Sequence, residues 1–222
     1  MKNYLFTAVL AFMAVTLHAQ NDWANFGKYE QNNREVMATT NDGRRVVFLG
    51  NSITENWRKM RPEFFTGHGF IARGISGQTS YQMLLRFRED VIALSPKVVV
   101  INAGTNDIAQ NNHPYVEDRT FGNIVSMCEI AKANGIKPVL CTATPADGIP
   151  WRPEVTAVVE QVKELNRRIT EYAKAKKYPL VDYWTALADK GGGFPRNLAP
   201  DGIHPNVDGY LIMEELLLKK LK

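Results

Sequence analysis

Cysteine and histidine are scarce in this chain, with two cysteines and four histidines among 222 residues. Neither type forms a group with the spacing of metal ligands, so no metal site is expected. Cys128 falls on the apolar face of an expected helix, and Cys141 falls inside an expected strand. A disulfide between them stays open, but the pattern favours two buried free thiols because unpaired cysteine is commonly buried.

A dense basic run is also missing. The formal net charge is +4, and lysine and arginine are spread along the chain, so nucleic acid is not an expected partner. Internal repeats, low-complexity stretches and linkers are absent as well. Residues 20–222 are therefore expected to form a single domain, since a chain of this length can build a full core.

The one long apolar run lies at the N-terminus. It extends from Tyr4 to Leu17, follows Lys2 and precedes the small residue Ala19, an arrangement typical of a cleavable signal peptide over residues 1–19. A membrane anchor is the alternative, but the run is shorter than the roughly 20 apolar residues that a spanning helix needs. There is no cysteine near the expected cleavage site, which argues against a lipid anchor attached there. The sequence predicts a periplasmic or extracellular protein without a stable membrane anchor.

Short apolar runs alternate with helical patterns along the rest of the chain. Continuous apolar runs are typical of strands covered on both faces, and spacings of three and four are typical of helices with one buried face. The expected strands are 46–49, 70–72, 98–101, 138–142 and 178–181. The expected helices are 23–40, 84–94, 121–134, 155–172 and 205 to the end. This alternation predicts an α/β fold with a parallel sheet between helices.

Polar segments follow the first three expected strands. Ser52 comes directly after the first strand, residues 74–79 follow the second, and residues 102–107 follow the third. Ligands bind outside the carboxyl ends of the strands in open α/β sheets, so we expect all three segments at one edge. Asp201 and His204 form a late Asp-x-x-His motif, whose spacing lets both side chains point the same way from one turn.

These residues suit acyl transfer through a serine nucleophile. A serine hydroxyl alone is a poor nucleophile at neutral pH, so Ser52 needs a base, His204, oriented by an acid, Asp201. The reaction also develops an oxyanion, which fixed hydrogen-bond donors stabilise. The backbone N–H groups of Ser52 and Gly77 and the side-chain amide of Asn106 are the candidate donors.

Each of these residues has a simpler structural interpretation when it is taken alone. Ser52 can cap a helix, and His204 can merely begin the last helix. Gly77 can be a turn glycine, and Asn106 can be a turn residue. Their occurrence in successive segments at one edge favours the catalytic interpretation. Asp107, beside Asn106, is expected to be a loop or cap residue.

Four segments together resemble the SGNH hydrolases of the GDSL esterase and lipase family. The resemblance is strongest to the branch similar to platelet-activating-factor acetylhydrolase subunits and secreted bacterial acylhydrolases. The segments are Gly50-Asn51-Ser52-Ile53, Gly74 to Thr79, Gly104 to Asp107, and Asp201 to Pro205. Their order and spacing match over nearly all of the chain after residue 19. One position departs from the family pattern, because Asn51 stands where Asp is usual.

The resemblance implies a flavodoxin-like three-layer α/β/α sandwich with a five-stranded parallel sheet. It implies Ser52 as nucleophile, His204 as base and Asp201 as the residue that orients it. It also implies an oxyanion hole made of Ser52, Gly77 and Asn106. Neither a metal nor an organic cofactor is implied.

The expected activity is hydrolysis of short acyl esters, with acetylated carbohydrate ranked ahead of lipid. Trp151 lies in a proline-rich loop after the fourth strand, where it can stack on a sugar ring or simply pack the loop. A phospholipid or lysophospholipid acylhydrolase is the enzymatic alternative, and it would need an apolar groove. A non-catalytic carbohydrate-binding module is the alternative of another class, which the complete set of catalytic residue types argues against. The oligomeric state stays open.

Overall fold

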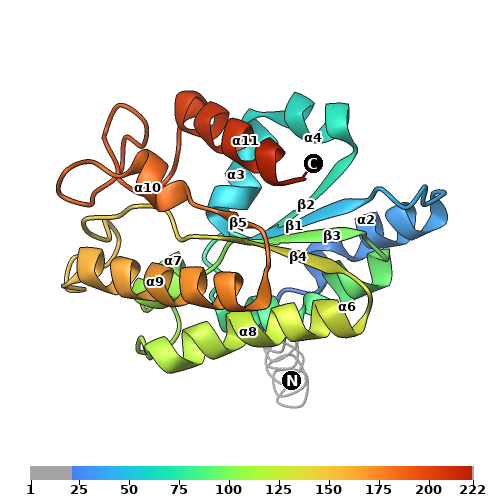
Figure 1. Ribbon diagram of the computed structural model, residues 1–222, viewed down its shortest axis with the longest axis horizontal. Helices are drawn as coiled ribbons and strands as arrows, with labels where there is room; N and C mark the ends of the chain where they lie inside the picture. Colours follow the sequence, from blue (N-terminus) through green and yellow to red (C-terminus); the bar gives the residue numbers. More distant parts are fainter. Residues whose placement is uncertain (1–21, 222) are drawn as a thin grey trace, which may run out of the picture.

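Five parallel strands form a single sheet with the order β2-β1-β3-β4-β5 (Figure 1). A computed structural model describes residues 22–221, so the expected signal peptide at 1–19 lies outside the described residues. The strands are β1 (Val46–Gly50), β2 (Phe70–Gly74), β3 (Val98–Ile101), β4 (Lys137–Cys141) and β5 (Leu180–Val181). The α/β prediction is therefore confirmed, with strand boundaries shifted by no more than two residues.

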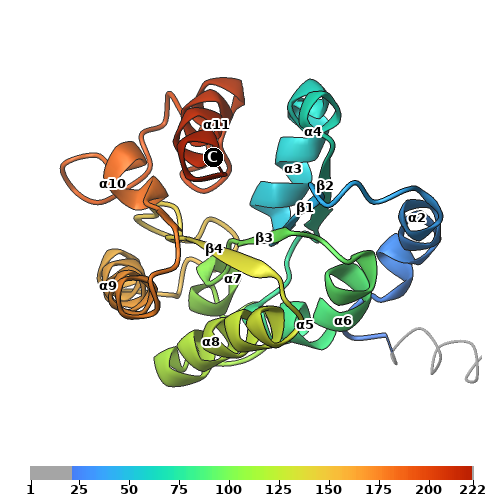
Figure 2. The same ribbon diagram turned by 45° about the vertical axis from the view of Figure 1, so that its right-hand side comes forward.

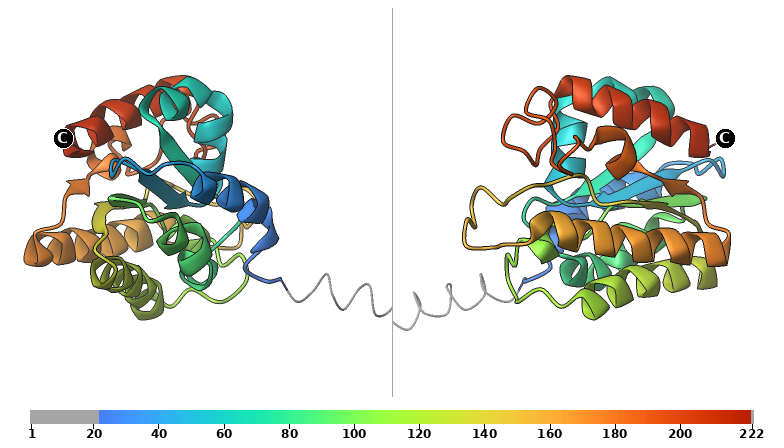
Figure 3. Two further views of the ribbon diagram at one scale, coloured as in Figure 1. Left: turned by 90° about the vertical axis from the view of Figure 1, so that its right-hand side faces the viewer. Right: turned by 60° about the vertical axis from the view of Figure 1, so that its left-hand side comes forward.

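Helices cover both faces of the sheet, which makes the three layers visible in Figures 2 and 3. One layer contains α3 (Ser52–Met60), α4 (Pro62–His68), α10 (Tyr183–Leu187) and α11 (Val207–Leu221). The opposite layer contains α5 (Ser80–Leu85), α6 (Phe87–Asp90), the short 3-10 helix η1 (Ile92–Leu94), α7 (Thr105–Ile108), α8 (Glu117–Ala133) and α9 (Val158–Lys176). The helix α2 (Gly27–Ala38) precedes the sheet and packs against α6 and η1.

The continuous apolar strands are explained by burial on both faces. Successive side chains of a strand point to opposite faces, so Val47 and Leu49 of β1 join one apolar cluster and Phe48 joins the other. All five residues of β1 are buried, because this strand pairs with β2 on one side and β3 on the other. Gly50 pairs with Gly74 at the ends of β1 and β2, which brings the segments that follow these strands together.

The expected helix over 84–94 is interrupted. The apolar spacing still holds, since Phe87, Val91 and Leu94 are buried, but the chain forms α5, α6 and η1 in succession. Arg86 lies at the first break, and its fully buried guanidinium donates to the carbonyls of Gly50 and Arg73 at 2.9 Å each. The hydrogen bonds of Arg86 to the ends of β1 and β2 are formed here in place of a continuous helix.

Several short helices were not predicted from the sequence. They are α3, α4, α7 and α10, and three of them directly follow a strand. The leading helix begins at Gly27, not at Trp23, because the Asp22 carboxylate accepts the backbone N–H groups of Phe26 and Gly27 and holds residues 22–26 in a turn.

Both cysteines are free and buried, as the sequence favoured. Cys128 of α8 belongs to the apolar cluster on one side of the sheet, and Cys141 of β4 belongs to the cluster on the other side. The sheet therefore separates the two thiols, and a disulfide between them would require the core to rearrange.

Candidate active site

Ser52 stands at the junction of β1 and α3. The preceding residue, Asn51, is the N-cap of α3, and its side-chain oxygen accepts the backbone N–H of Ile53 at 2.9 Å. An asparagine side chain can make this bond as an aspartate would, without adding a charge beside Ser52. As the first residue of α3, Ser52 has a backbone N–H without an intrahelical acceptor, and this N–H is available to a ligand.

Close packing of backbone brings the junction near the neighbouring loop. A Cβ atom on Gly74, at the end of β2, would come within 2.3 Å of the Glu55 backbone nitrogen and 2.7 Å of the Asn51 carbonyl oxygen. Only glycine permits this approach of β2 to the first turn of α3. The segment after β2 is therefore held beside Ser52.

The structure brings Ser52, His204 and Asp201 into one hydrogen-bonded series. Ser52 Oγ lies 2.8 Å from His204 Nε2, and His204 Nδ1 lies 2.6 Å from Asp201 Oδ2. Asp201 Oδ1 also accepts the backbone N–H groups of Ile203 at 2.9 Å and His204 at 2.8 Å. The imidazole is thus held with Nδ1 toward the acid and Nε2 toward the hydroxyl.

Asp201 remains a carboxylate at neutral pH. Burial raises the pKa of its carboxyl, but the hydrogen bonds from His204 and from the Ile203 N–H outweigh burial, and the pKa lies below its ordinary value. A charged Asp201 favours the tautomer of His204 in which Nδ1 carries the proton and Nε2 is free to accept one.

Gly77 and Asn106 lie beside Ser52 in the same groove. Gly77 has a φ of +79°, a left-handed conformation that glycine adopts at low cost, and its N–H has no acceptor within residues 22–221. The amide of the buried Asn106 donates to the Gln78 carbonyl at 3.0 Å. This bond occupies one of two N–H groups and sets the orientation of the amide, so the other remains available.

The groove has a volume of about 570 Å³, and most of the residues that line it carry polar side chains. Its walls are Ser52, Asn56, Ser76, Gly77, Asn106, Asn111, Trp151 and His204. Sequence reasoning missed Asn56 and Asn111. Helical spacing could have predicted Asn56, because a residue four positions after Ser52 lies on the same face of a helix. Asn111 follows the third polar segment by several residues, and no pattern in the sequence marks it.

Trp151 forms the wall next to the imidazole. Its ring stacks on the ring of His204, with centroids 6.0 Å apart and planes 29° apart. Its indole N–H donates to Asn111 Oδ1 at 2.8 Å, and Asn111 in turn donates to the Gly77 carbonyl at 3.1 Å. The indole nevertheless remains 41% exposed, so part of the ring can contact a ligand.

Asp107 has a structural role, as predicted. Its buried carboxylate accepts the backbone N–H of Ser80 at 2.9 Å and the Ser80 hydroxyl at 2.6 Å, which ties the start of α5 to α7. Thr120 of α8 donates to the same carboxylate at 3.2 Å. Asp107 therefore points away from the groove and connects three helices.

A sequence model of the GDSL-like lipase/acylhydrolase family matches residues 48–212. The crystal structure of a GDSL-like lipase from Bacteroides thetaiotaomicron is 49% identical to this chain, with a TM-score of 0.88 over 90% of this chain and 98% of that one. This match covers the fold and, in both chains, nearly the whole length.

Two acetylxylan esterases are more distant relatives. The enzyme of Xylanibacter ruminicola is 25% identical over an alignment of 225 positions that covers 85% of this chain and 45% of the relative, so the chain spans less than half of that protein. The enzyme of Geobacillus stearothermophilus is 26% identical over 212 residues, which cover 81% of this chain and 94% of the relative.

Proposed function

The chain belongs to the GDSL-like lipase/acylhydrolase family and is a carboxylic ester hydrolase, and on this premise we propose that it is a serine esterase that removes short acyl groups, acetyl above all, from carbohydrate. The observation that carries the proposal is the hydrogen-bonded series from Ser52 Oγ through His204 to Asp201. The polar side chains that line the groove around Ser52 and the two acetylxylan esterase relatives support the choice of substrate class.

In the first step, Ser52 Oγ attacks the ester carbonyl carbon while His204 Nε2 accepts the hydroxyl proton. The negative charge that develops on the carbonyl oxygen is stabilised by the backbone N–H groups of Ser52 and Gly77 and by the free amide N–H of Asn106. Asp201 stabilises the imidazolium that forms. When the tetrahedral intermediate collapses, His204 returns the proton to the alcohol oxygen, and the acyl group stays on Ser52.

In the second step, water replaces the alcohol. His204 removes a proton from the water as it attacks the acyl carbonyl, and the same donors stabilise the second oxyanion. The bond to Ser52 Oγ then breaks, and His204 protonates the departing oxygen. The second step releases the free acid and restores the enzyme, so each turnover consumes one ester and one water and gives one alcohol and one acid.

The lining of the groove favours a sugar over a lipid. Amide and hydroxyl groups from Asn56, Ser76 and Asn111 can exchange hydrogen bonds with sugar hydroxyls, whereas an acyl chain of eight or more carbons would bury polar groups without partners. Trp151 is the one large apolar side chain in the lining, and an exposed indole beside the catalytic residues can stack on a sugar ring.

Activity on p-nitrophenyl esters of graded length tests this proposal. We expect kcat/KM to fall by about tenfold or more from acetate to octanoate, because Trp151 is the one large apolar side chain that lines the groove and a longer chain would lie against amide and hydroxyl groups. A preference for octanoate would support the phospholipid or lysophospholipid alternative. No turnover of any ester would support a non-catalytic carbohydrate-binding module.

Replacing Trp151 separates sugar recognition from chemistry. We expect Trp151→Ala to raise the KM for an acetylated xylooligosaccharide by about tenfold, and to affect p-nitrophenyl acetate much less, because that ester has no sugar to stack. Trp151→Phe is the matched control, since it keeps an aromatic ring for stacking while it removes the N–H bonded to Asn111 and part of the ring surface. Equal losses on both acetates would instead assign the ring to the packing of His204.

Secretion is part of the proposal and rests on the sequence of residues 1–19. Within residues 22–221, no helix is both long enough and apolar enough to cross a membrane. Acetylated polysaccharide is too large to enter a cell intact, so a deacetylase that acts on it directly has to work outside the cytoplasm. Fractionation of cells that express the whole chain measures the location.

A further inference from the structure

Residues 22–38 lie outside the segment 48–212 that matches the family, yet they form hydrogen bonds with Gly74 and Gln78, which lie on either side of Gly77 in the sequence. The oxyanion loop is defined here as residues 74–79, between β2 and α5. Figure 2 shows α2 next to α6. We propose that residues 22–38 position the oxyanion loop, so that Gly77 and Asn106 are held where the transition state needs them. This inference rests on the oxyanion role given to both residues above.

The first contact runs through Gln78 to Asn106. The side-chain amide of Gln78 donates to the Ala24 carbonyl at 2.6 Å, and both residues are buried. The backbone carbonyl of Gln78 accepts the amide of Asn106 at 3.0 Å. Residues 22–26 therefore help to hold Gln78 in place, and the backbone carbonyl of Gln78 sets the orientation of the Asn106 amide.

The second contact holds the beginning of the loop. The Tyr29 hydroxyl of α2 donates to the backbone carbonyl of Gly74, and the guanidinium of Arg73 lies 4.6 Å from the centre of the Tyr29 ring. Burial raises the pKa of Tyr29 to about 12, so the hydroxyl keeps its proton and remains a donor over the whole working pH range.

The third contact acts on the residue before Gly77. Glu55 of α3 accepts both the backbone N–H of Ser76 at 2.7 Å and its hydroxyl at 2.8 Å. Two ammonium groups hold the same carboxylate, Lys28 of α2 and Lys59 of α3, each at 2.9 Å. Burial raises the pKa of Glu55, but the bonds from Lys59, Lys28 and Ser76 lower it to about 2. Glu55 is therefore charged at neutral pH, and Lys28 and Lys59 together hold its position.

The three contacts reach the loop on both sides of Gly77. Oxyanion donors are effective only within about 2.7–3.1 Å of the developing charge, and a displacement of about 1 Å can cost up to 10²-fold in rate. Gly77 also has to keep its left-handed conformation, which a loosely held loop would not maintain. Weakening the contacts should therefore lower kcat while substrate affinity changes little.

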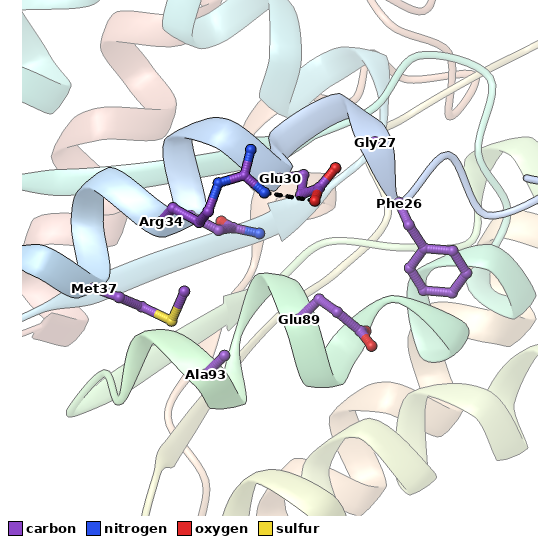
Figure 4. A pocket seen from close by; sticks show the side chains of 8 residues that line it. Phe26, Gly27, Glu30, Arg34, Met37, Glu89 and Ala93 are labelled. Carbon is purple, nitrogen blue, oxygen red and sulfur yellow. Dashed lines mark hydrogen bonds and ion pairs between the residues drawn. The ribbon is translucent and has the colours of Figure 1, made fainter.

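The opposite face of α2 supplies a control. There Phe26, Arg34 and Met37 line a separate groove with Glu89 of α6, and Arg34 pairs with Glu30 at 2.5 Å (Figure 4). This face makes no contact with the oxyanion loop. A substitution at Arg34 perturbs the same helix and leaves the three contacts intact.

The test compares Lys28→Met/Tyr29→Phe with Arg34→Ala in the whole chain, using p-nitrophenyl acetate. We expect the double variant to lose about tenfold in kcat with KM within twofold of the parent, and Arg34→Ala to match the parent. Lys28→Arg, which keeps the charge at Glu55, should retain most of the activity. If the double variant does not fold, Tyr29→Phe alone, which removes one hydroxyl, is measured instead, with a kcat loss of about threefold expected.

A double-mutant cycle distinguishes positioning from general support of the fold. In an Asn106→Ala background the substitutions on α2 should cost less than in the parent, because the loop that Lys28 and Tyr29 hold also carries the Gln78 carbonyl, which orients the donor removed in this background. Full additivity, an unchanged kcat in the double variant, or an equal loss in Arg34→Ala would each overturn the inference. Turnover by Ser52→Ala would overturn the proposed function itself, so the two failures are separate results.

Discussion

Ser52→Ala is expected to lower kcat by about 10⁵–10⁶, the largest effect of any single change in this chain. The substitution removes the hydroxyl 2.8 Å from His204 Nε2, and no acyl-enzyme can then form. The backbone N–H of residue 52 and the rest of the groove remain, so a small residual rate above that of water is expected. Turnover of p-nitrophenyl acetate measures the loss.

Covalent labelling tests whether Ser52 is the nucleophile without a measurement of turnover. An alkyl fluorophosphonate should add one phosphonyl group to the parent chain at Ser52, as located by mass spectrometry of peptides, and none to Ser52→Ala. Ser126→Ala, a serine of α8 in the helical layer on the other face of the sheet from α3, is the matched control and should react like the parent. Near-full turnover by Ser52→Ala, or labelling at another residue, would show that Ser52 is not the nucleophile.

Asn106→Ala is expected to lower kcat by about 10²–10³ and to change KM by less than threefold. In the proposed mechanism its free amide N–H stabilises the carbonyl oxygen as that oxygen gains charge, so we expect its loss to affect the transition state more than the bound substrate. Steady-state kinetics on p-nitrophenyl acetate measure the two constants separately. Asn106→Asp keeps the shape but cannot donate, and it should be at least as slow.

Asn56→Ala is the matched control for Asn106, because it removes the same amide from another wall of the same groove. Its expected effect is mainly on the KM for sugar esters, with a kcat loss below tenfold. Far-UV circular dichroism checks that the Asn106 variants keep their fold, since the bond to the Gln78 carbonyl is lost. An unchanged kcat in folded Asn106→Ala would remove this residue from the oxyanion hole.

The strands were predictable because their signal is local. A run such as Val98 to Ile101 has to be apolar throughout when helices cover both faces of a parallel sheet, and β3 has these same bounds in the structure. Helix boundaries were less predictable. Arg86 interrupts a regular apolar pattern because its partners, Gly50 and Arg73, lie 36 and 13 residues away in the sequence.

Some residues of the candidate site could likewise be predicted from the sequence, and others could not. Segments 74–79 and 102–107 could be assigned to one edge because the carboxyl ends of parallel strands meet there. Asn111 and Glu55 could not be assigned any role, since their importance depends on what they contact. Asn111 connects Trp151 to Gly77, and Glu55 connects α2 to Ser76.

The sequence by itself determined the class of fold, the family and the residue types for acyl transfer, because periodicity and short motifs are written within a few neighbouring residues. Only the tertiary structure decided that Ser52 and His204, 152 residues apart, lie 2.8 Å from each other. It also decided that Trp151 stacks on the imidazole and that residues 22–38 reach the oxyanion loop. Such contacts depend on how distant elements pack, and a linear pattern does not record the distance between side chains that the fold brings together.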